Sequence, residues 1–155
     1  MNSAATLAFK ELLFQHCVQL LTQKASALKA EIVQLREGIA NDSKSSMGDK
    51  YETSREMSQQ EINRLEQQLG LIGQQQFQLK SIAMKSEMPQ IGFGSLVATN
   101  IGRFFISIAL GEIKIDTENI FVISPASPIG KLMIGKQSGE TFKMNQKQVE
   151  IIEFY

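Results

Sequence analysis

The stretch FQHCVQLLTQKASALKAEIVQLREGI, residues 14–39, decides the first half of the fold. Its apolar residues recur at alternating steps of four and three, at Phe14, Val18, Leu21, Ala25, Leu28, Ile32, Leu35 and Ile39. This spacing keeps side chains on one face of an α-helix, as at the a and d positions of a coiled coil. We therefore predict a long helix from about Ser3 to Ala40, roughly 50 Å in length.

A second stretch with the same spacing follows after a polar interruption. Its positions are Ile62, Leu65, Leu69, Ile72, Gln76, Leu79 and Ala83. The segment NDSKSSMG, residues 41–48, separates the two stretches and favours a turn over a helix. Two such helices joined by a short polar turn predict an antiparallel helical hairpin. A parallel coiled-coil dimer is the alternative, although it would place the polar segment inside a continuous rod.

The composition changes at Met88-Pro89, which predicts a domain boundary there. All three prolines lie at or after position 89, and so do seven of the eleven glycines. We assign residues 1–88 to the helical hairpin, whose tip carries acidic residues, and residues 89–155 to a second domain. A hairpin of this length buries only one seam, so we interpret it as a probe that carries its tip away from the second domain.

After the boundary the apolar residues recur with a period close to two, which predicts strands. The six candidates are residues 95–98, 103–108, 112–115, 120–123, 141–144 and 149–154, separated by turn-forming pairs such as Asn145-Gln146. Ser127 followed by Pro128 is typical of a helix start, and Gly135 of a helix end. The predicted class is α+β, with an antiparallel sheet and one short helix packed on it.

Length, charge and composition exclude several classes of protein. A chain of 155 residues holds one ordinary domain or two small ones. Basic and acidic residues number 16 each, which argues against binding nucleic acid through a broad basic surface. A single cysteine, Cys17, and a single histidine, His16, exclude a disulfide framework and a Cys/His zinc site. No apolar run approaches the ~18 residues of a membrane span, so we expect a soluble, cytoplasmic protein.

Three segments of the second half have counterparts, in the same order, in a known family. They are IGFGSLV (residues 91–97), SPIGKLMIGK (residues 127–136) followed by Gly139 and Glu140, and VEIIE (residues 149–153). The second of them is similar to a family segment that reads Ser-Pro-Ile-(Ala)-x-x-Leu-Ile-Gly-Lys-x-x-Gly-Asp. Together they resemble the C-terminal domain of the bacterial Gre transcript-cleavage factors, the GreA/GreB family. The resemblance implies an FKBP-like fold for residues 89–155.

The predicted tip of the hairpin keeps part of a family motif in GDKYET, residues 48–53. Gre factors carry Gly-Asp-Leu-Ser-Glu-Asn there, and Asp49 and Glu52 match its two carboxylates, while Lys50 and Tyr51 replace Leu-Ser. The resemblance implies that both carboxylates are catalytic in trans, because they help bind a second Mg²⁺ in the polymerase active site. A capping box, with Asp49 as the helix N-cap and Glu52 three residues on, is the alternative. The two roles are compatible.

The same resemblance implies a function for the whole chain. It would bind RNA polymerase, insert its tip into the secondary channel and stimulate cleavage of backtracked RNA, without being an enzyme or holding Mg²⁺ stably by itself. It would be a monomer, and would reach nucleic acid only through the polymerase. Docking would involve Ser127, Pro128, Ile129 and Lys131, although these residues also suit a short capped helix packed on its own domain. Two alternatives stay open: a secondary-channel regulator that inhibits or modulates without cleavage, and a coiled-coil adaptor unrelated to transcription.

Overall fold

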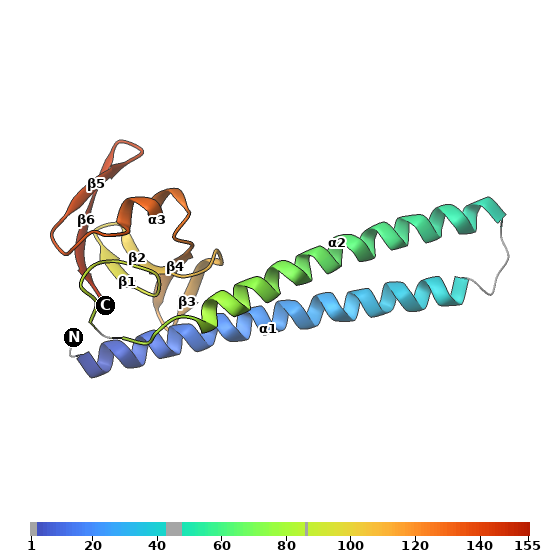
Figure 1. Ribbon diagram of the computed structural model, residues 1–155, viewed down its shortest axis with the longest axis horizontal. Coiled ribbons are helices and arrows are strands. Elements are labelled where there is room, and N and C mark those ends of the chain that lie inside the picture. The colour runs from blue at the N-terminus through green and yellow to red at the C-terminus, as the bar shows by residue number, and fades with distance from the viewer. Residues whose placement is uncertain (1–2, 43–47, 86) are drawn as a thin grey trace. The chain divides into compact units, whose positions relative to one another are not determined.

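The computed structural model describes residues 3–42, 48–85 and 87–155 of the chain (Figure 1). Two long helices come first, α1 (Ser3–Asp42) and α2 (Gly48–Lys80). The elements that follow are β1 (Leu96–Thr99), β2 (Gly102–Ile106), β3 (Gly111–Ile115), β4 (Glu118–Ile123), α3 (Pro128–Met133), β5 (Thr141–Met144) and β6 (Lys147–Phe154). The predicted α+β class is confirmed, and each strand candidate overlaps one observed strand.

The chain forms two compact units. The hairpin unit is Val18–Phe77, and the sheet unit combines the chain up to Cys17 with Gln78–Tyr155. Because α1 runs from Ser3 to Asp42, its first turns belong to the sheet unit and its remainder to the hairpin unit. Composition places the domain boundary between residues 88 and 89. The packing instead groups residues up to Cys17 and residues from Gln78 onward in one unit with the sheet.

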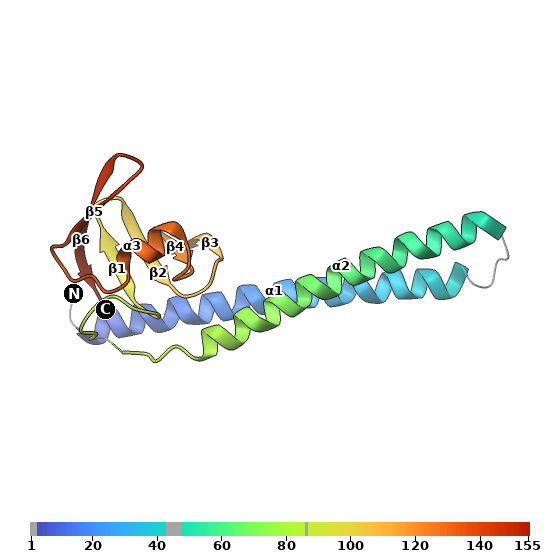
Figure 2. The same cartoon turned by 45° about the horizontal axis from the view of Figure 1, so that its top comes forward.

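In the hairpin unit, α1 and α2 run antiparallel and pack through the apolar face that the spacing predicts (Figures 1 and 2). Ile32, Ile62 and Leu65 form its buried centre. Half-buried side chains surround them, namely Leu28, Leu35, Ile39 and Leu69. Removing these side chains from water is the main favourable contribution to the packing of the two helices. The chain reverses direction between the helices, as the hairpin prediction requires.

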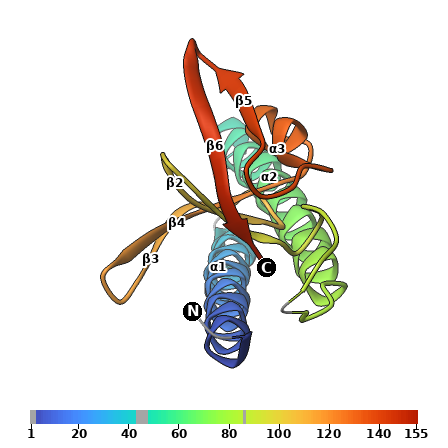
Figure 3. The ribbon, with the colours of Figure 1, turned by 90° about the vertical axis from the view of Figure 1, so that its left-hand side faces the viewer.

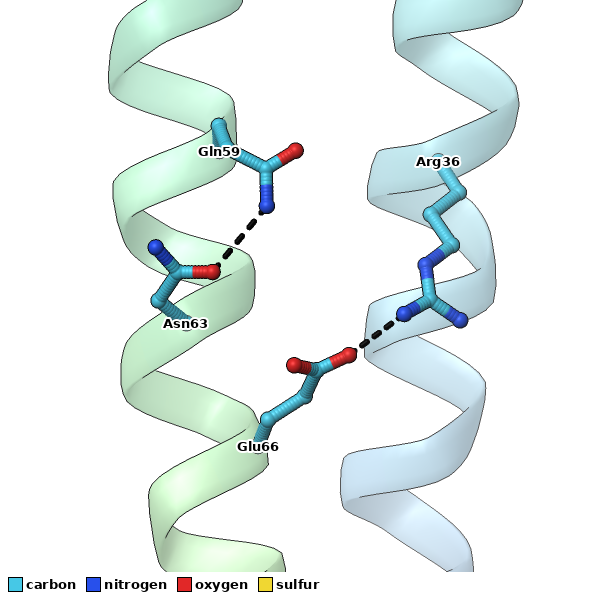
Figure 4. A network of polar contacts seen from close by, with 4 residues as sticks. All are labelled: Arg36, Gln59, Asn63 and Glu66. Atoms are coloured by element: carbon cyan, nitrogen blue, oxygen red, sulfur yellow. Dashed lines mark hydrogen bonds and ion pairs between the residues drawn. The ribbon is translucent and has the colours of Figure 1, made fainter.

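Polar contacts lie beside this apolar centre (Figure 4). Arg36 on α1 forms an ion pair with Glu66 on α2, and Gln59 Nε2 donates a hydrogen bond to Asn63 Oδ1 at 3.0 Å. The side chains of Arg36 and Glu66 are 60% and 46% exposed, so water and salt screen the pair. It contributes at most about 1 kcal/mol. Apolar burial, rather than this ion pair, therefore holds the two helices together.

The buried face of α1 changes where the helix belongs to the sheet unit. The spacing predicts Phe14 and Val18 as buried, but the structure buries Leu13 and Cys17 fully and leaves the predicted pair half-buried. The prediction is wrong here because the first turns of α1 pack in the sheet unit, not along α2. A single repeating pattern cannot describe a helix that has two different neighbours.

The segment between α2 and β1 also belongs to the sheet unit. α2 ends at Lys80, so Ala83, which the spacing places on the apolar face, is exposed, and Ile82 is buried instead. Gly94, with φ +93°, lies against Ile82, and a Cβ atom at Gly94 would come within 2.9 Å of Ile82 Cγ2. This contact therefore requires a glycine, and it holds the connecting segment close to the start of the sheet.

The six strands form one sheet in the order β3-β4-β2-β1-β6-β5. β2 and β4 run parallel, while the other neighbouring pairs are antiparallel. The predicted antiparallel sheet is therefore corrected to a mixed one. In the sequence β3 comes between β2 and β4, but in the sheet β3 pairs with the outer edge of β4. β4 therefore lies next to β2 and runs in the same direction. Alternating apolar residues indicate a strand but not its direction.

The short helix α3 begins and ends as predicted. Ser127 is its N-cap, and the Ser127 side chain accepts a hydrogen bond from the Gly130 amide at 3.1 Å. Pro128 occupies the first helical position, where its missing amide hydrogen costs nothing. Gly135 follows the helix with φ +84°, a conformation that glycine adopts without strain.

Both faces of the sheet carry buried side chains. One face packs with Met133 of α3, in a core completed by Ile91, Val97, Phe104, Ile106, Phe142, Val149 and Ile151. Phe105, which alternates with Phe104 along β2, is fully buried on the opposite face. Arg103 shares that opposite face and contacts Phe9 of α1, with 4.7 Å from the guanidinium carbon to the ring centre. The first turns of α1 therefore cover the second face, close to the end of β6 (Figure 3).

Candidate functional site

The two acidic residues predicted to act in trans, Asp49 and Glu52, lie in the first turns of α2. Residues three apart on a helix occupy one face of it, so the two positions are neighbours. Glu52 is exposed. The side chain of Asp49 lies outside the described residues, as do those of Lys50 and Tyr51. Both acidic positions lie at the end of the hairpin unit that is farthest along the chain from the sheet unit.

The helix boundary revises the capping prediction for Asp49. α2 begins at Gly48, so Asp49 lies in the first turn and not at the residue before the helix. The residue that would cap α2 falls in residues 43–47, outside the described ranges. An acidic residue in the first turn of a helix still gains about 0.3–1 kcal/mol from the positive end of the helix dipole. This gain does not depend on a capping hydrogen bond.

The chemistry of this pair suits a shared metal ion. Carboxylate oxygens are preferred ligands of Mg²⁺, which is commonly held by one or two carboxylates together with waters and phosphates. Among the residues that the structure describes, no group of three or more His, Cys, Asp and Glu side chains is arranged to hold a metal ion. Asp49 and Glu52 have the donor atoms to complete a Mg²⁺ site whose other ligands come from elsewhere.

The second predicted site is the α3 segment, and two of its four predicted docking residues are used inside the sheet unit. Ser127 Oγ donates a hydrogen bond to a backbone carbonyl at 2.7 Å and accepts one from a backbone amide at 3.1 Å. Ile129 is half-buried against the core on the α3 face of the sheet. Pro128 and Lys131 are exposed, and only these two can contact a partner without rearrangement of the helix.

Two apolar residues of this segment are more exposed than the sequence suggests. Leu132 and Ile134 are expected to pack α3 onto its domain, yet they are 37% and 40% exposed. Met133 is fully buried in their place, and Gly130 lies on the same buried face. A helix this short buries only one narrow face, so the burial of Met133 leaves its neighbours outward. Together with Lys131 they form an exposed apolar and basic patch.

A third cluster, which the sequence pattern did not reveal, attaches α1 to the sheet within the sheet unit. Lys10 is fully buried, and its Nζ donates hydrogen bonds to the main-chain oxygens of Lys85 at 2.8 Å and Tyr155 at 3.0 Å. Beside it, the Phe9 ring contacts the Arg103 guanidinium. Such a cation–π contact contributes about 0.5–2 kcal/mol. We name Phe9, Lys10, Arg103 and Tyr155 the α1 anchor.

A signal for Lys10 is present in the sequence. Five buried residues of α1 are spaced three or four positions apart, and Lys10 is one of them: Thr6, Lys10, Leu13, Cys17 and Leu21. Lysine is almost never fully buried, so a pattern search treats it as exposed. The apolar spacing that starts at Phe14 is easier to recognise, so the buried face that includes Lys10 is overlooked.

The α1 anchor holds an unusual combination of charges. Burial lowers the pKa of Lys10 to about 8, because a low-polarity site disfavours the ammonium form. Burial, followed by a hydrogen bond with Glu153, raises the pKa of the Tyr155 phenol. Arg103 forms an ion pair with Glu118. Lys10 donates to the main-chain oxygens of Lys85 and Tyr155.

Cys17 and His16 both lie in the packed part of α1. Cys17 is fully buried, and burial raises the pKa of its thiol to about 12. A thiol with that pKa stays protonated at neutral pH and is a poor nucleophile. Cys17 is therefore not suited to act as a nucleophile. His16 is half-buried next to it.

No family model matches this chain, and no curated protein or solved structure matches it. Within the described ranges, no helix combines the length and the apolar character that a membrane span requires. The case for a function therefore rests on the tip of the hairpin unit and on the α3 segment.

Proposed function

We propose that this protein is a Gre-like transcription elongation factor that binds RNA polymerase in the cytoplasm. The tip of its hairpin enters the secondary channel of the polymerase and stimulates cleavage of backtracked RNA. The factor is not an enzyme by itself, because the reacting centre belongs to the polymerase. It acts as a monomer and meets nucleic acid only inside the complex.

The observation that carries this proposal is the position of the acidic pair in an antiparallel hairpin. α2 has 33 residues, which span roughly 50 Å, and the pair lies in its first turns. Glu52 is exposed there. An acidic residue that only stabilised a helix would serve a short helix equally well. A long hairpin that ends in an acidic tip is better explained by the need to bring carboxylates to a distant, narrow site.

The finer description of the fold belongs to the same proposal. We infer a coiled coil for the hairpin unit, supported by the spacing of its buried residues Leu21, Ala25 and Ile32. We infer an FKBP-like fold for the sheet unit. The SPIGKLMIGK segment (residues 127–136) supports it, since the helix that this segment forms packs on one face of a six-stranded mixed sheet.

In the proposed chemistry this chain contributes only two carboxylate groups. Asp49 and Glu52 add oxygen ligands to a Mg²⁺ ion that the polymerase holds. Such an ion activates water for attack on a phosphodiester and stabilises the charge that develops on the phosphate. The factor supplies two acidic positions fixed on one helix face. The water, the RNA and the remaining ligands are all bound by the polymerase.

Docking on the polymerase near the channel mouth is assigned to the sheet unit. Its contact surface is the exposed patch of Pro128, Lys131, Leu132 and Ile134. Apolar area at the centre of an interface provides affinity, and a charge at its rim provides orientation. Ser127 and Ile129 support this patch from inside by capping α3 and packing it on the sheet.

One departure from the family pattern favours a second candidate. Lys50 and Tyr51 replace the Leu-Ser of the family tip, so a basic residue stands between the two acidic ones. A nearby ammonium group weakens the attraction of the tip for a cation. A factor with such a tip can occupy the secondary channel and modulate the polymerase without promoting cleavage.

A backtracked elongation complex tests the proposal. Purified protein added to such a complex is expected to shorten the RNA, and Asp49→Asn or Glu52→Gln is expected to reduce the cleavage rate at least about tenfold. Even outer-shell partners of a metal typically contribute 10–100-fold, and these residues would be direct ligands. Binding to the polymerase is measured in parallel and is expected to stay unchanged.

Glu56→Gln is the matched control, because Glu56 is exposed on α2 one turn beyond Glu52. This variant is expected to cleave as the unsubstituted protein does. Inhibition of the polymerase without RNA shortening would replace the proposal with the modulator. Absence of polymerase binding would leave the adaptor unrelated to transcription.

A further inference from the structure

The strand β3 forms one edge of the sheet, and the proposed function does not use it. β3 pairs with β4 on one side and has no strand on its other side in the described part of the chain (Figure 3). An edge strand presents unpaired backbone N–H and C=O groups, which can pair with a strand of another chain. Which strand the edge accepts depends on the residues that point outward and on their charges.

Two residues of β3 direct their backbone groups away from β4. Ile115 and Glu118 flank a two-residue loop, so they form a pair that exchanges both hydrogen bonds. Such pairs alternate along an antiparallel ladder, so the next one is formed by Ile113 and its partner in β4. The alternate residues of β3, Glu112 and Lys114, therefore direct their N–H and C=O groups to the open edge.

The same two residues carry opposite charges on one face of the strand. Glu112 and Lys114 are exposed, whereas Ile113 and Ile115 point to the other face and are buried. Neither charged side chain forms an ion pair with a described residue of its own chain. The β3 edge therefore presents a carboxylate and an ammonium group, each available to a partner.

These charges complement those of a second copy of β3. When two copies pair antiparallel about a two-fold axis at Ile113, Glu112 of each copy lies directly opposite Lys114 of the other. The outward backbone groups of the same residues then meet and exchange hydrogen bonds. Moving the axis by one residue keeps this hydrogen-bond pattern but places Glu112 or Lys114 opposite itself. Like charges directly opposite are destabilising, so the register about Ile113 is preferred.

The other edge of the sheet, β5, lacks this complementarity. Its only charged residue is Lys143, which is exposed. Two copies of β5 would bring no opposite charges together. The β5 edge therefore provides a comparison within the same sheet.

We propose that the free protein forms a weak, symmetric dimer through the β3 edges of two copies. A strand of five residues on each side buries far less than the about 1,200 Å² of a stable interface. The dimer is therefore expected at high protein concentration and dissociates on dilution. It exchanges with the monomer that the proposed function uses, and it does not depend on that function.

Sedimentation equilibrium of the intact chain, from micromolar to millimolar concentration, measures the dimer. Lys114→Glu and Glu112→Lys each place like charges opposite one another, and each is expected to weaken the dimer at least about tenfold. An equimolar mixture of the two variants is expected to associate again, because unlike charges then face each other in both pairs. Lys143→Glu, which changes an exposed lysine on the β5 edge, is the matched control and is expected to leave the dimer unchanged.

Hydrogen exchange locates the contact. The backbone amides of Glu112 and Lys114 are expected to exchange more slowly as the protein concentration rises, while that of Lys143 does not change. Added salt is expected to weaken the dimer, because it screens exposed ion pairs.

Three results would overturn the proposal. A chain that stays monomeric up to millimolar concentration leaves the edge to a strand of another protein. A mixture of the two variants that fails to associate, although the unsubstituted chain does, rules out the charge pairing. A dimer in which the amides of Glu112 and Lys114 keep their exchange rates is joined through another surface.

Discussion

At the scale of the residue, the packing around Gly130 leaves no room for a side chain. A Cβ atom there would lie 2.8 Å from Ser127 Oγ and would overlap the carbonyl oxygen of Ser124. Both atoms belong to the turn that caps α3. A residue larger than glycine therefore fits at this position only if the capping turn moves.

Gly130→Ala is therefore expected to destabilise the sheet unit by about 1–3 kcal/mol, because the capping turn must move to make room. Urea unfolding followed by circular dichroism measures the free energy. Gly38→Ala is the control, since a Cβ at Gly38 meets nothing within 4 Å and lies inside α1. The control is expected to gain up to about 1 kcal/mol. Equal effects of the two substitutions would contradict the steric argument.

At the scale of the element, the sequence predicts what depends on near neighbours in the chain. The capping signals of Ser127 and Gly135 located α3, and alternation located all six strands. Strand direction was missed because β2 and β4 become neighbours only through a chain crossing. The burial of Leu13 in place of Phe14 was missed for a similar reason, since the packing partner of α1 changes along its length.

The β5–β6 hairpin contains a local strain that the sequence does not relieve. Its two-residue loop joins Met144 to Lys147, and both Asn145 and Gln146 have positive φ, 51° and 66°. Asn tolerates this conformation and Gln does not, whereas Asn-Gly is the preferred pair for such a loop. Gln146→Gly is expected to stabilise the sheet unit by about 0.5–1 kcal/mol in urea unfolding.

Asn145→Gly gives the comparison for that loop. It changes a residue that already adopts positive φ at low cost, so its effect is expected to be smaller than that of Gln146→Gly. If Gln146→Gly weakened the protein instead, the backbone strain assigned to Gln146 would be wrong.

At the scale of the whole molecule, the sheet unit is assembled from two distant parts of the chain. Residues 89–155 contain every strand, but one face of their sheet is covered by the first turns of α1. Without that cover, buried residues such as Leu96 and Phe105 would meet water. Each large side chain left exposed in this way costs about 1.5–3 kcal/mol.

A fragment of residues 89–155 is accordingly expected to lack the cooperative unfolding of the intact protein. Residues 78–155 mixed with a peptide of residues 3–17 are expected to recover it, in proportion to peptide concentration. Amide exchange in β1 and β2 reports the recovery. Full protection in the shorter fragment alone would show that α1 is dispensable to the sheet.

The candidate site itself stays a prediction, but the positions of its residues depend on the same physical factors. The positions of Asp49 and Glu52 at the start of α2 follow from local signals, and the structure places their backbone there. The exposure of Leu132 and the burial of Lys10 depend on contacts made across the sheet unit. A pattern of residue types assigns lysine to the surface and leucine to the core, so it misplaces both.

The contact between Lys10 and Tyr155 can form only late in synthesis of the chain. The two residues lie 145 positions apart. At about 5–20 residues per second, the ribosome adds Tyr155 on the order of ten seconds or more after Lys10. The hairpin unit, whose helices are contiguous in the chain, can pair during that interval. During that interval the apolar face of the first turns of α1 is exposed on the nascent chain. It becomes buried only after β6 has been synthesised.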